Sequence, residues 1–511
     1  MILSREDAEK KGIWNSKKHI SYILYLDCNN LYGWALSQPL PIGEFLNYNL
    51  LHKKSIDNTK EKLKTFLECK NEKLVNLTKS LLNCEDQIEF EKIIHEMLQF
   101  ESFKKKINEF ICGNKNHKKL EFKPTDFTEE MILNLDDNGE YGYTFIVDLE
   151  IPVELHNKFK DYPMLPEHYI PKEEELSGYQ RELIAKDIGS KPKEGKLITT
   201  LYSKKDYIID FRMLKECLRQ GIILKSVNNY IRFKQKAWLK SYIDMNTKLR
   251  QEAKNDFEKD FYKLMNNSVY GKQMENVRNR CDVKILTTPE SFLKQSNYET
   301  RTILDEETIL LARKKQTVKL NKPIYGGFVV LEISKLLMYQ FYYNVLKKKY
   351  GDKVRLLGTD TDSLIVYIET NDVYEDIKED IDHYDTFDYK IEWMPQKNKK
   401  VPGLFKDEYL GIPICEWVGL RSKMYAFRND IKEKKVCKGI KKSNIEKMKF
   451  EMYKNCLVES KQTREKVYSI ISKQHHLYTV ELDKIALSPY DDKRYLVDNI
   501  NTLPYGFQLN I

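Results

Sequence analysis

The sequence predicts an α+β fold, because it combines short β-prone apolar runs with long segments whose apolar residues recur at helical spacing. Two of the apolar runs, at 25–33 and 357–366, carry acidic residues at their ends or turns. The segment at 52–111 is rich in Lys and Glu and almost free of Pro and Gly, which is typical of helices. With 511 residues, the chain has room for about three domains.

In order along the chain, a strand leads to Asp27 and is followed by a turn built on Asn29, Asn30 and Gly33. The other expected elements are a helical insertion at 52–111, strands between 139 and 202, a helix at 211–220 that Gly221 stops before a strand, two helical arms at 238–253 and 257–269, short strands at 281–325, a helix at 331–347, a strand pair around 360–362 and a helical segment at 444–472. No internal repeat or low-complexity tract interrupts this order.

The composition indicates a packed protein that suits a polyanionic partner. Hydrophobic residues make up 41% of the chain and aromatic residues 12%, which is enough for packed cores. The net charge is +9, and lysines recur beside aromatic residues at 230–238 and 346–350, a mixture that can contact phosphates and stack on bases. Each of these clusters is explained equally well as the solvent-exposed face of an element whose apolar side packs in the core.

Nine scattered cysteines without a Cys-x-x-Cys pair argue against a disulfide framework and against a zinc or iron–sulfur site. The charged N-terminus lacks the features of a signal peptide. The sequence contains no run of about 18 apolar residues, the length needed to span a membrane. We therefore expect a soluble intracellular protein without a membrane partner. Nucleus, cytoplasm and organelle all stay open.

The acidic residues in the two apolar runs predict a metal-dependent centre. Asp27 follows the run at 23–26, and Asp360 and Asp362 lie between the runs at 354–357 and 364–367. Acids buried among strand residues are costly unless a cation neutralises them. Carboxylates from separate strands can hold two divalent ions about 3.5–4 Å apart, as in the in-line transfer of phosphoryl or nucleotidyl groups. A polymerase active site is the leading hypothesis.

A third motif, at 263–272, adds groups that suit a nucleotide. On a helix, Lys263, Asn267 and Tyr270 fall at i, i+4 and i+7, and therefore on one face. That face would offer a cation, an amide and an aromatic ring together, while Arg250 and Lys254 add cations upstream. Taken alone, the motif is more often a helix with solvated lysines and a buried tyrosine.

Together these motifs resemble family B DNA polymerases, in the protein-primed branch found in viruses, organellar plasmids and Maverick/Polinton transposons. Residues 27–32 are similar to the first palm motif, 263–271 to the fingers motif, 359–363 to the Asp-Thr-Asp-Ser motif and 422–425 to the Lys-x-Tyr motif, in the family's order. The resemblance runs from about residue 20 to the C-terminus. It implies a DNA-directed DNA polymerase core, a nucleotidyltransferase of DNA replication in a mobile element.

The implied architecture is a right hand, with a palm of antiparallel sheet and helices, helical fingers and a thumb. An insertion separates the first two polymerase motifs. The implied bounds are an N-terminal remnant at 1–19, palm at 20–44, a helical then β insertion at 45–200, palm at 201–235, fingers at 236–275, a second insertion at 276–325, palm at 326–429, and thumb with C-terminal tail at 430–511.

The resemblance also implies the metal ligands. Asp27 and Asp362 would share two Mg²⁺ ions, with Mn²⁺ as an alternative, and the backbone carbonyl of Cys28 would complete the shell. Asp360 would support the site near the primer end. Lys263 would neutralise charge that develops on the phosphates.

The remaining implied residues bind nucleotide and DNA. Tyr32 would lie beneath the incoming sugar and exclude a 2′-hydroxyl, in a nucleotide site that also includes Asn30, Leu31, Arg250, Lys254, Asn267 and Tyr270. The primer strand would contact Ser363, Lys423 and Tyr425. The implied partners are primer–template DNA and deoxynucleoside triphosphates, with a terminal priming protein as a further candidate, and we expect a monomer.

The chain departs from the family in three respects. Asn30 replaces the usual Ser and Gly33 the usual Pro, and both still suit a tight turn. Gly358 replaces a bulky residue near the third motif. Only 26 residues precede Asp27, where the family carries a 3′–5′ exonuclease domain. We interpret Asp148 and Glu150 as polar positions on a strand rather than as an exonuclease site, and therefore expect no proofreading.

Two other functions compete with an active polymerase. The chain could be a catalytically inactive DNA-binding remnant of a virus-like mobile element, although the acids, Lys263 and Tyr270 are all intact. It could also be another two-metal enzyme, such as a nuclease or a reverse transcriptase. Reverse transcriptases place two acids side by side, whereas Thr361 separates Asp360 from Asp362.

Overall fold

The computed structural model describes residues 21–47, 72–83, 97, 100, 127–295, 298–429, 432–473 and 476–508. The chain divides into two compact units. The first comprises the chain up to Leu40 together with Ile151–Tyr202 and Ala237–Ile511, and the second comprises Pro41–Glu150 and Ser203–Lys236. Both units are built from helices and antiparallel sheets, so the predicted α+β class is confirmed.

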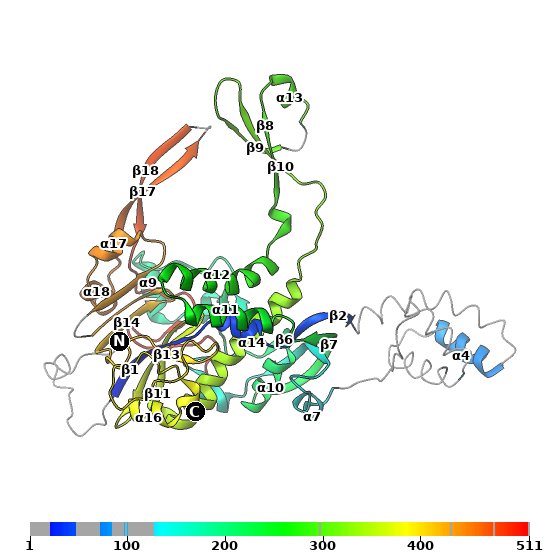
Figure 1. Ribbon diagram of the computed structural model, residues 1–511, viewed down its shortest axis with the longest axis horizontal. Coiled ribbons are helices and arrows are strands. Elements are labelled where there is room, and N and C mark those ends of the chain that lie inside the picture. The colour runs from blue at the N-terminus through cyan, green and yellow to red at the C-terminus, as the bar shows by residue number, and fades with distance from the viewer. Residues whose placement is uncertain are drawn as a thin grey trace. The chain divides into compact units, whose positions relative to one another are not determined.

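The centre of the first unit is a four-stranded antiparallel sheet in the order β11-β12-β1-β13 (Figure 1). Its strands are β1 (Ser21–Cys28), β11 (Val354–Asp360), β12 (Ser363–Glu369) and β13 (Phe405–Asp407). Four consecutive residues of β1, from Ile23 to Leu26, are buried, so both faces of this strand are covered. That is why its sequence is continuously apolar and does not alternate.

Two helices support this sheet. The short helix α2 (Leu31–Leu36) follows β1 directly and packs against α14 (Ile324–Gln340), which continues as a π-helix over Phe341–Lys347. Phe341 stacks on Phe405 of β13 with ring centroids 3.6 Å apart. The helix expected at 331–347 therefore exists and begins seven residues earlier, at Ile324.

The two helical arms expected at 238–253 and 257–269 are present as α11 (Lys240–Glu252) and α12 (Asp256–Gln273), which pack side by side (Figure 1). Asn255 caps α12 by accepting a hydrogen bond from the Glu258 amide. A Cβ atom on Gly327 of α14 would lie 2.1 Å from Met274 Sδ, so this glycine allows the end of α12 to approach α14.

A three-stranded sheet follows, formed by β14 (Glu416–Arg421), β15 (Met424–Arg428) and β16 (Glu433–Cys437). The prediction of helix for 444–472 is wrong over its second half. Helices α17 (Lys442–Lys447) and α18 (Phe450–Val458) are followed by β17 (Arg464–Lys473), which pairs with β18 (His476–Ile485) as a hairpin (Figure 1). Ser460, at φ 50°, ends α18, and β17 contains Val467, Tyr468 and two isoleucines, which favour strand.

The strands expected at 281–325 form a three-stranded sheet in the order β8-β10-β9. Their bounds are Cys281–Leu286, Ile309–Lys314 and Tyr298–Ile303, respectively. The remaining elements of the first unit are η2 (Val153–Leu155), α8 (His156–Phe159), β4 (Glu167–Tyr169), η3 (Glu173–Glu175), α9 (Gly178–Ala185), β5 (Lys196–Ile198), η4 (Val277–Asn279), α13 (Pro289–Leu293), α15 (Lys348–Tyr350), η6 (Gly351–Lys353), α16 (Val373–Glu379), η7 (Ile381–His383), β19 (Tyr495–Leu496) and β20 (Thr502–Leu503).

The second unit is built on a four-stranded antiparallel sheet in the order β2-β7-β3-β6. Its elements are β2 (Leu40–Asn47), α4 (Glu72–Asn83), α7 (Glu129–Leu133), β3 (Tyr141–Glu150), β6 (Lys204–Asp210), α10 (Phe211–Arg219) and β7 (Ile223–Lys236). Helix α10 and the strand after Gly221 match the prediction. Of the helical insertion expected at 52–111, α4 is described, and most of the rest lies outside the described residues, as does the remnant at 1–19.

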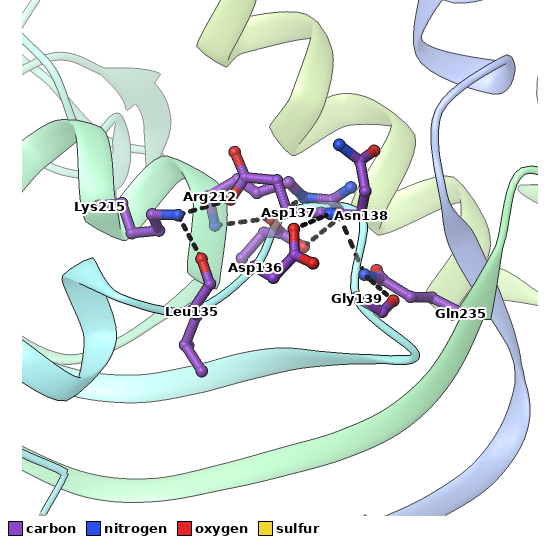
Figure 2. Close-up of polar contacts among 9 residues, drawn as sticks. Leu135, Asp136, Asp137, Asn138, Gly139, Arg212, Lys215 and Gln235 are labelled. Carbon is purple, nitrogen blue, oxygen red and sulfur yellow. Dashed lines mark hydrogen bonds and ion pairs between the residues drawn. The ribbon is translucent and has the colours of Figure 1, made fainter.

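A polar network fixes the turn at 135–139 to α10 and β7 of this second unit (Figure 2). Lys215 Nζ donates to the Leu135 carbonyl at 2.6 Å and pairs with Asp137 Oδ1 at 2.7 Å. Gln235 Nε2 donates to the carbonyls of Asp137 and Gly139. Because Lys215 and Gln235 are almost fully buried, this network satisfies polar groups that would otherwise be costly. The domain bounds implied by the resemblance stay a prediction.

Candidate active site

The sheet of the first unit brings two predicted carboxylates together. In the antiparallel register of β1 and β12, Asp27 lies opposite Ser363. The Cys28 amide donates to the backbone carbonyl of Asp362 at 2.7 Å. Asp27 and Asp362, which are far apart in sequence, therefore lie side by side at one end of the sheet.

A tight turn between β11 and β12 carries the Asp-Thr-Asp motif. Asp360 lies opposite Ser363, and the Asp362 amide donates to the Asp360 carbonyl at 2.7 Å. Thr361 takes a left-handed backbone conformation at φ 62°, which is unfavourable for a β-branched residue. The strained turn separates the two acids, so that Asp362 faces Asp27 while Asp360 pairs elsewhere.

The Asp27 carboxyl is held in an unfavourable electrostatic environment. Burial raises its pKa from the usual 3.8 to about 7, and the neighbouring Asp362 and Glu408 carboxylates contribute in the same direction. Burial also raises the pKa of Asp362. Lys263 acts on both acids and lowers both pKa values, so one ammonium partly compensates two carboxylates. A bound cation would relieve the remaining repulsion.

Two residues near Asp27 were not found from the sequence. Glu408 follows β13, and its amide donates to the Tyr25 carbonyl at 3.0 Å. Lys434 of β16 places its ammonium 4.2 Å from the Tyr25 ring centroid and lowers the pKa of Asp27. Both line a cavity of 640 Å³. Acidic residues follow the apolar residues at 404–405, just as Asp27 follows an apolar run. This pattern is the sequence signal that could have identified Glu408.

The Lys-x-Tyr motif lies beside the other acid of the turn. Lys423, in the turn between β14 and β15, pairs with Asp360 at 2.9 Å. The Tyr425 ring is buried in the core against Phe427, and burial is the first cause that raises its pKa. Ser363 is buried and donates to the Asp360 carbonyl at 3.4 Å. Lys423 and Asp360 are half-buried and are the more accessible parts of this group, and the predicted DNA contacts stay a prediction.

The turn after β1 explains both departures from the family motif. Asn30 takes the left-handed conformation at φ 46° before α2. Its side chain folds over Gly33, where an added Cβ would lie 2.0 Å from Asn30 Nδ2. Asn30 Oδ1 is buried and has no hydrogen-bond partner among the described residues. Asn30 and Gly33 are therefore a matched pair, while Leu31 is buried in the core.

The first motif and the fingers motif meet through two aromatic rings. Tyr32 of α2 stacks on Tyr270 of α12 with ring centroids 4.6 Å apart and an angle of 7°. Burial raises the pKa of both hydroxyls. Asn267 is half-buried on the same helix. Its neighbour Asn266, which the sequence did not single out, is fully buried, and both amide atoms lack a partner within the described part of the chain.

Of the two upstream cations, Arg250 interacts electrostatically with Asp27, and for Lys254 the described residues show no such interaction. Arg250 is half-buried, and burial lowers its pKa, while the charges of Asp260 and Asp27 act in the opposite direction. Lys254 is exposed in the link between α11 and α12. Lys259, one turn before Lys263, and Arg250 both lie close enough to Lys400 for their charges to lower its pKa. The prediction for Lys254 rested on helical spacing that the break between the two helices removes.

Asp148 and Glu150 have partners within their own sheet in the second unit. Asp148 Oδ1 accepts hydrogen bonds from the Asp206 amide and from Asn228 Nδ2, both at 2.8 Å. Glu150 pairs with Lys225 at 2.9 Å. These contacts agree with their interpretation as polar strand positions.

Among the described residues, Asp27 and Asp362 are the two predicted metal ligands that meet at the site, with Glu408 beside Asp27. Within the described ranges, no group of three or more His, Cys, Asp or Glu side chains has the arrangement of a metal cage. Two repelling carboxylates beside a backbone carbonyl suit an oxygen-seeking cation that keeps water or substrate ligands, as Mg²⁺ does. Among the same described residues, no helix has both the length and the apolar character needed to cross a membrane.

No protein-family model matches the chain, and no curated protein matches it. Solved structures of phi29 DNA polymerase resemble it at low identity. The ternary complex with primer–template DNA and incoming nucleotide is 15% identical, with a TM-score of 0.43 over 93% of this chain and 60% of that one. An orthorhombic crystal form is 13% identical, with a TM-score of 0.45 over 95% and 64%. The chain thus spans less than two thirds of these polymerases, and at this similarity its function must be argued from its own residues.

Proposed function

We propose that this chain is a DNA-directed DNA polymerase core that adds deoxynucleotides to a primer. The observation that carries the proposal is the meeting of Asp27 and Asp362 at one end of the β1–β12 pair, with Lys263 acting on both. Burial raises the pKa of Asp27, and the charges of Asp362 and Glu408 raise it further, so a bound cation would favour the ionised form of this carboxyl. Strand-end acids that need a divalent cation, beside a helix that carries a lysine and a stacking tyrosine, suit nucleotidyl transfer.

Asp27, Asp362 and the Cys28 carbonyl would hold the two Mg²⁺ ions. When bound, such ions activate the primer hydroxyl and stabilise the charge that develops on the phosphates. Lys263 would add a fixed positive charge on the fingers side. Lys423, which pairs with Asp360, would contact the primer strand next to the acids.

The Tyr32–Tyr270 stack would receive the sugar and base of the incoming nucleotide. Its two rings come from different elements, so the nucleotide would insert between α2 and α12 and separate them. Tyr32 would then limit space at the 2′ position of the sugar. Protein priming and a place in a mobile element belong to the proposal as implications of the family resemblance.

The test is extension of a labelled DNA primer–template with Mg²⁺ and deoxynucleotides. The parent should extend the primer, and Asp362→Asn, which keeps the size of the side chain, should lose extension by at least about a thousandfold, the scale expected when a group that stabilises the transition state is lost. Asp148→Asn is the matched control, because it neutralises a strand carboxylate that lies in the other unit.

Two other outcomes of this experiment would contradict the proposal. If neither the parent nor Asp362→Asn extends the primer, yet both bind DNA with steep salt dependence, the chain is an inactive DNA-binding remnant. If Asp362→Asn extends as well as the parent, the assignment of the catalytic acids is wrong.

A further inference from the structure

A second group of cations lies next to the site, on the segment 396–403 that precedes β13. Lys399 and Lys400 lie on this segment, and neither was singled out from the sequence. Gln251 Nε2, next in sequence to Arg250 on α11, donates to the Lys399 carbonyl at 2.7 Å. The segment is therefore attached to α11 at the position of Arg250.

One buried carboxylate also ties this segment to the turn after Asp27. Asp385 Oδ2 accepts hydrogen bonds from Asn29 Nδ2 and from the Lys400 amide, both at 2.8 Å, and Oδ1 accepts from the Phe387 amide at 3.1 Å. The Gly403 amide donates to the Asn29 carbonyl at 2.8 Å. Asp385 is 1% exposed, so this connection is built into the core. It places Lys400 in a fixed relation to the turn that follows the metal ligands.

The Lys400 ammonium is surrounded mainly by like charges. Burial is the first cause that lowers its pKa, followed by the positive charges of Arg250, Lys259 and Lys399. Asp388 opposes this shift, but its carboxylate already pairs with Lys406. Such a concentration of positive charge is unfavourable unless an anion binds there.

The partners of the other three cations offset only part of this charge, including Asp260 and Asp27, whose charges act on Arg250. Lys259 pairs at 3.0 Å with Asp256, which is highly exposed, so solvent screens that pair. The Lys399 ammonium lies 4.6 Å from the centre of the Phe387 ring. Arg250 Nε is buried without a hydrogen-bond partner among the described residues. A buried donor without an acceptor is costly, and a bound anion would satisfy it.

We propose that Lys399 and Lys400 bind the polyphosphate chain of the incoming nucleotide, together with Arg250 and Lys259 from the fingers helices. The cradle would then have two sides, one from α11 and α12 and one from the segment before β13. Asp385 would act as a positioning residue that holds the second side in register with Asp27. The identification of the polyphosphate as that of an incoming nucleotide rests on the proposed function, whereas the presence of a polyphosphate site does not.

The site can be tested by titrating the whole chain with inorganic tripolyphosphate in the absence of divalent metal. Lys400→Gln should weaken binding by about tenfold, the scale of one charge-assisted hydrogen bond, and Lys399→Gln should weaken it in the same direction. Lys397→Gln is the matched control, because this lysine is exposed on the same segment and takes no part in the cluster. Melting temperatures of all variants would exclude misfolding as the cause of a loss.

A second experiment distinguishes the polyphosphate of a nucleotide from the DNA backbone as the source of the bound phosphates. In primer extension, Lys400→Gln should raise the KM for deoxynucleotides while leaving the affinity for primer–template duplex unchanged. Weaker duplex binding with unchanged tripolyphosphate binding would assign the cations to the DNA backbone and overturn the inference. If Lys400→Gln binds tripolyphosphate as tightly as Lys397→Gln does, the inference is overturned as well. If the parent binds tripolyphosphate through Lys400 but never extends a primer, the polymerase proposal fails and the polyphosphate site stands.

Discussion

Replacing Asp362 by Asn should stabilise the metal-free protein while it abolishes primer extension. In the folded chain, Asp27 is half-buried beside Asp362 and Glu408, and its pKa is raised from 3.8 to about 7. Removing the negative charge of Asp362 removes the largest cause of that shift after burial. The variant is therefore expected to gain stability at the expense of its proposed metal site.

The magnitude and sign follow from linkage. A shift of about three units, at 1.36 kcal/mol each, sets an upper bound of about 4 kcal/mol on the destabilisation. Because the folded pKa of this acid is raised, the folded state binds a proton that the unfolded state releases. The destabilisation therefore grows as pH rises from about 4 to about 7 and is constant above that range. Since burial accounts for the largest part of this destabilisation, we assign about 1–2 kcal/mol of it to the charge of Asp362.

The assay is the melting temperature of the parent and Asp362→Asn at pH 5 and pH 8, with and without Mg²⁺. Without metal, the variant should melt above the parent at pH 8, and the difference should almost vanish at pH 5, where Asp27 is protonated in both folded proteins. Millimolar Mg²⁺ should stabilise the parent at pH 8 and leave the variant nearly unchanged. A variant that is less stable at pH 8, or equally stabilised at both pH values, would refute the electrostatic reasoning.

Three further predictions concern neighbouring residues. Gly33→Ala should destabilise the protein by about 1–3 kcal/mol through its clash with Asn30, and Asn30→Ser should restore most of the loss, which urea unfolding of the single and double variants would measure. Asp385→Ala should cost about 3–5 kcal/mol, because three amide donors lose their acceptor, and a loss below 1 kcal/mol in the same assay would contradict its role. Tyr32→Ala should reduce discrimination against ribonucleotides by about tenfold or more, measured as the ratio of kcat/KM values for the two nucleotides.

The local elements of the site were predictable because their signals are short in range. The apolar run before Asp27 predicts a buried strand, and the spacing from Lys263 to Tyr270 predicts a helix, and both are found. The hairpin at 464–485 was missed, because its first strand follows a true helix and its partner strand lies beyond the predicted segment. A strand that is stable only when paired leaves a weak signal in its own sequence.

The sequence by itself singled out the residues that are proposed to carry the chemistry and the order in which they occur. It supplied the acids at 27, 360 and 362, the lysine and tyrosine of the fingers helix, and the Lys-x-Tyr turn. Only the tertiary structure decided that Asp27 faces Asp362 while Asp360 pairs with Lys423. It also decided that Glu408, Lys434 and Lys400 lie beside the site. These contacts depend on which strands pair and in what register, a choice made by packing across the whole chain, and hydrophobic periodicity within one segment does not encode it.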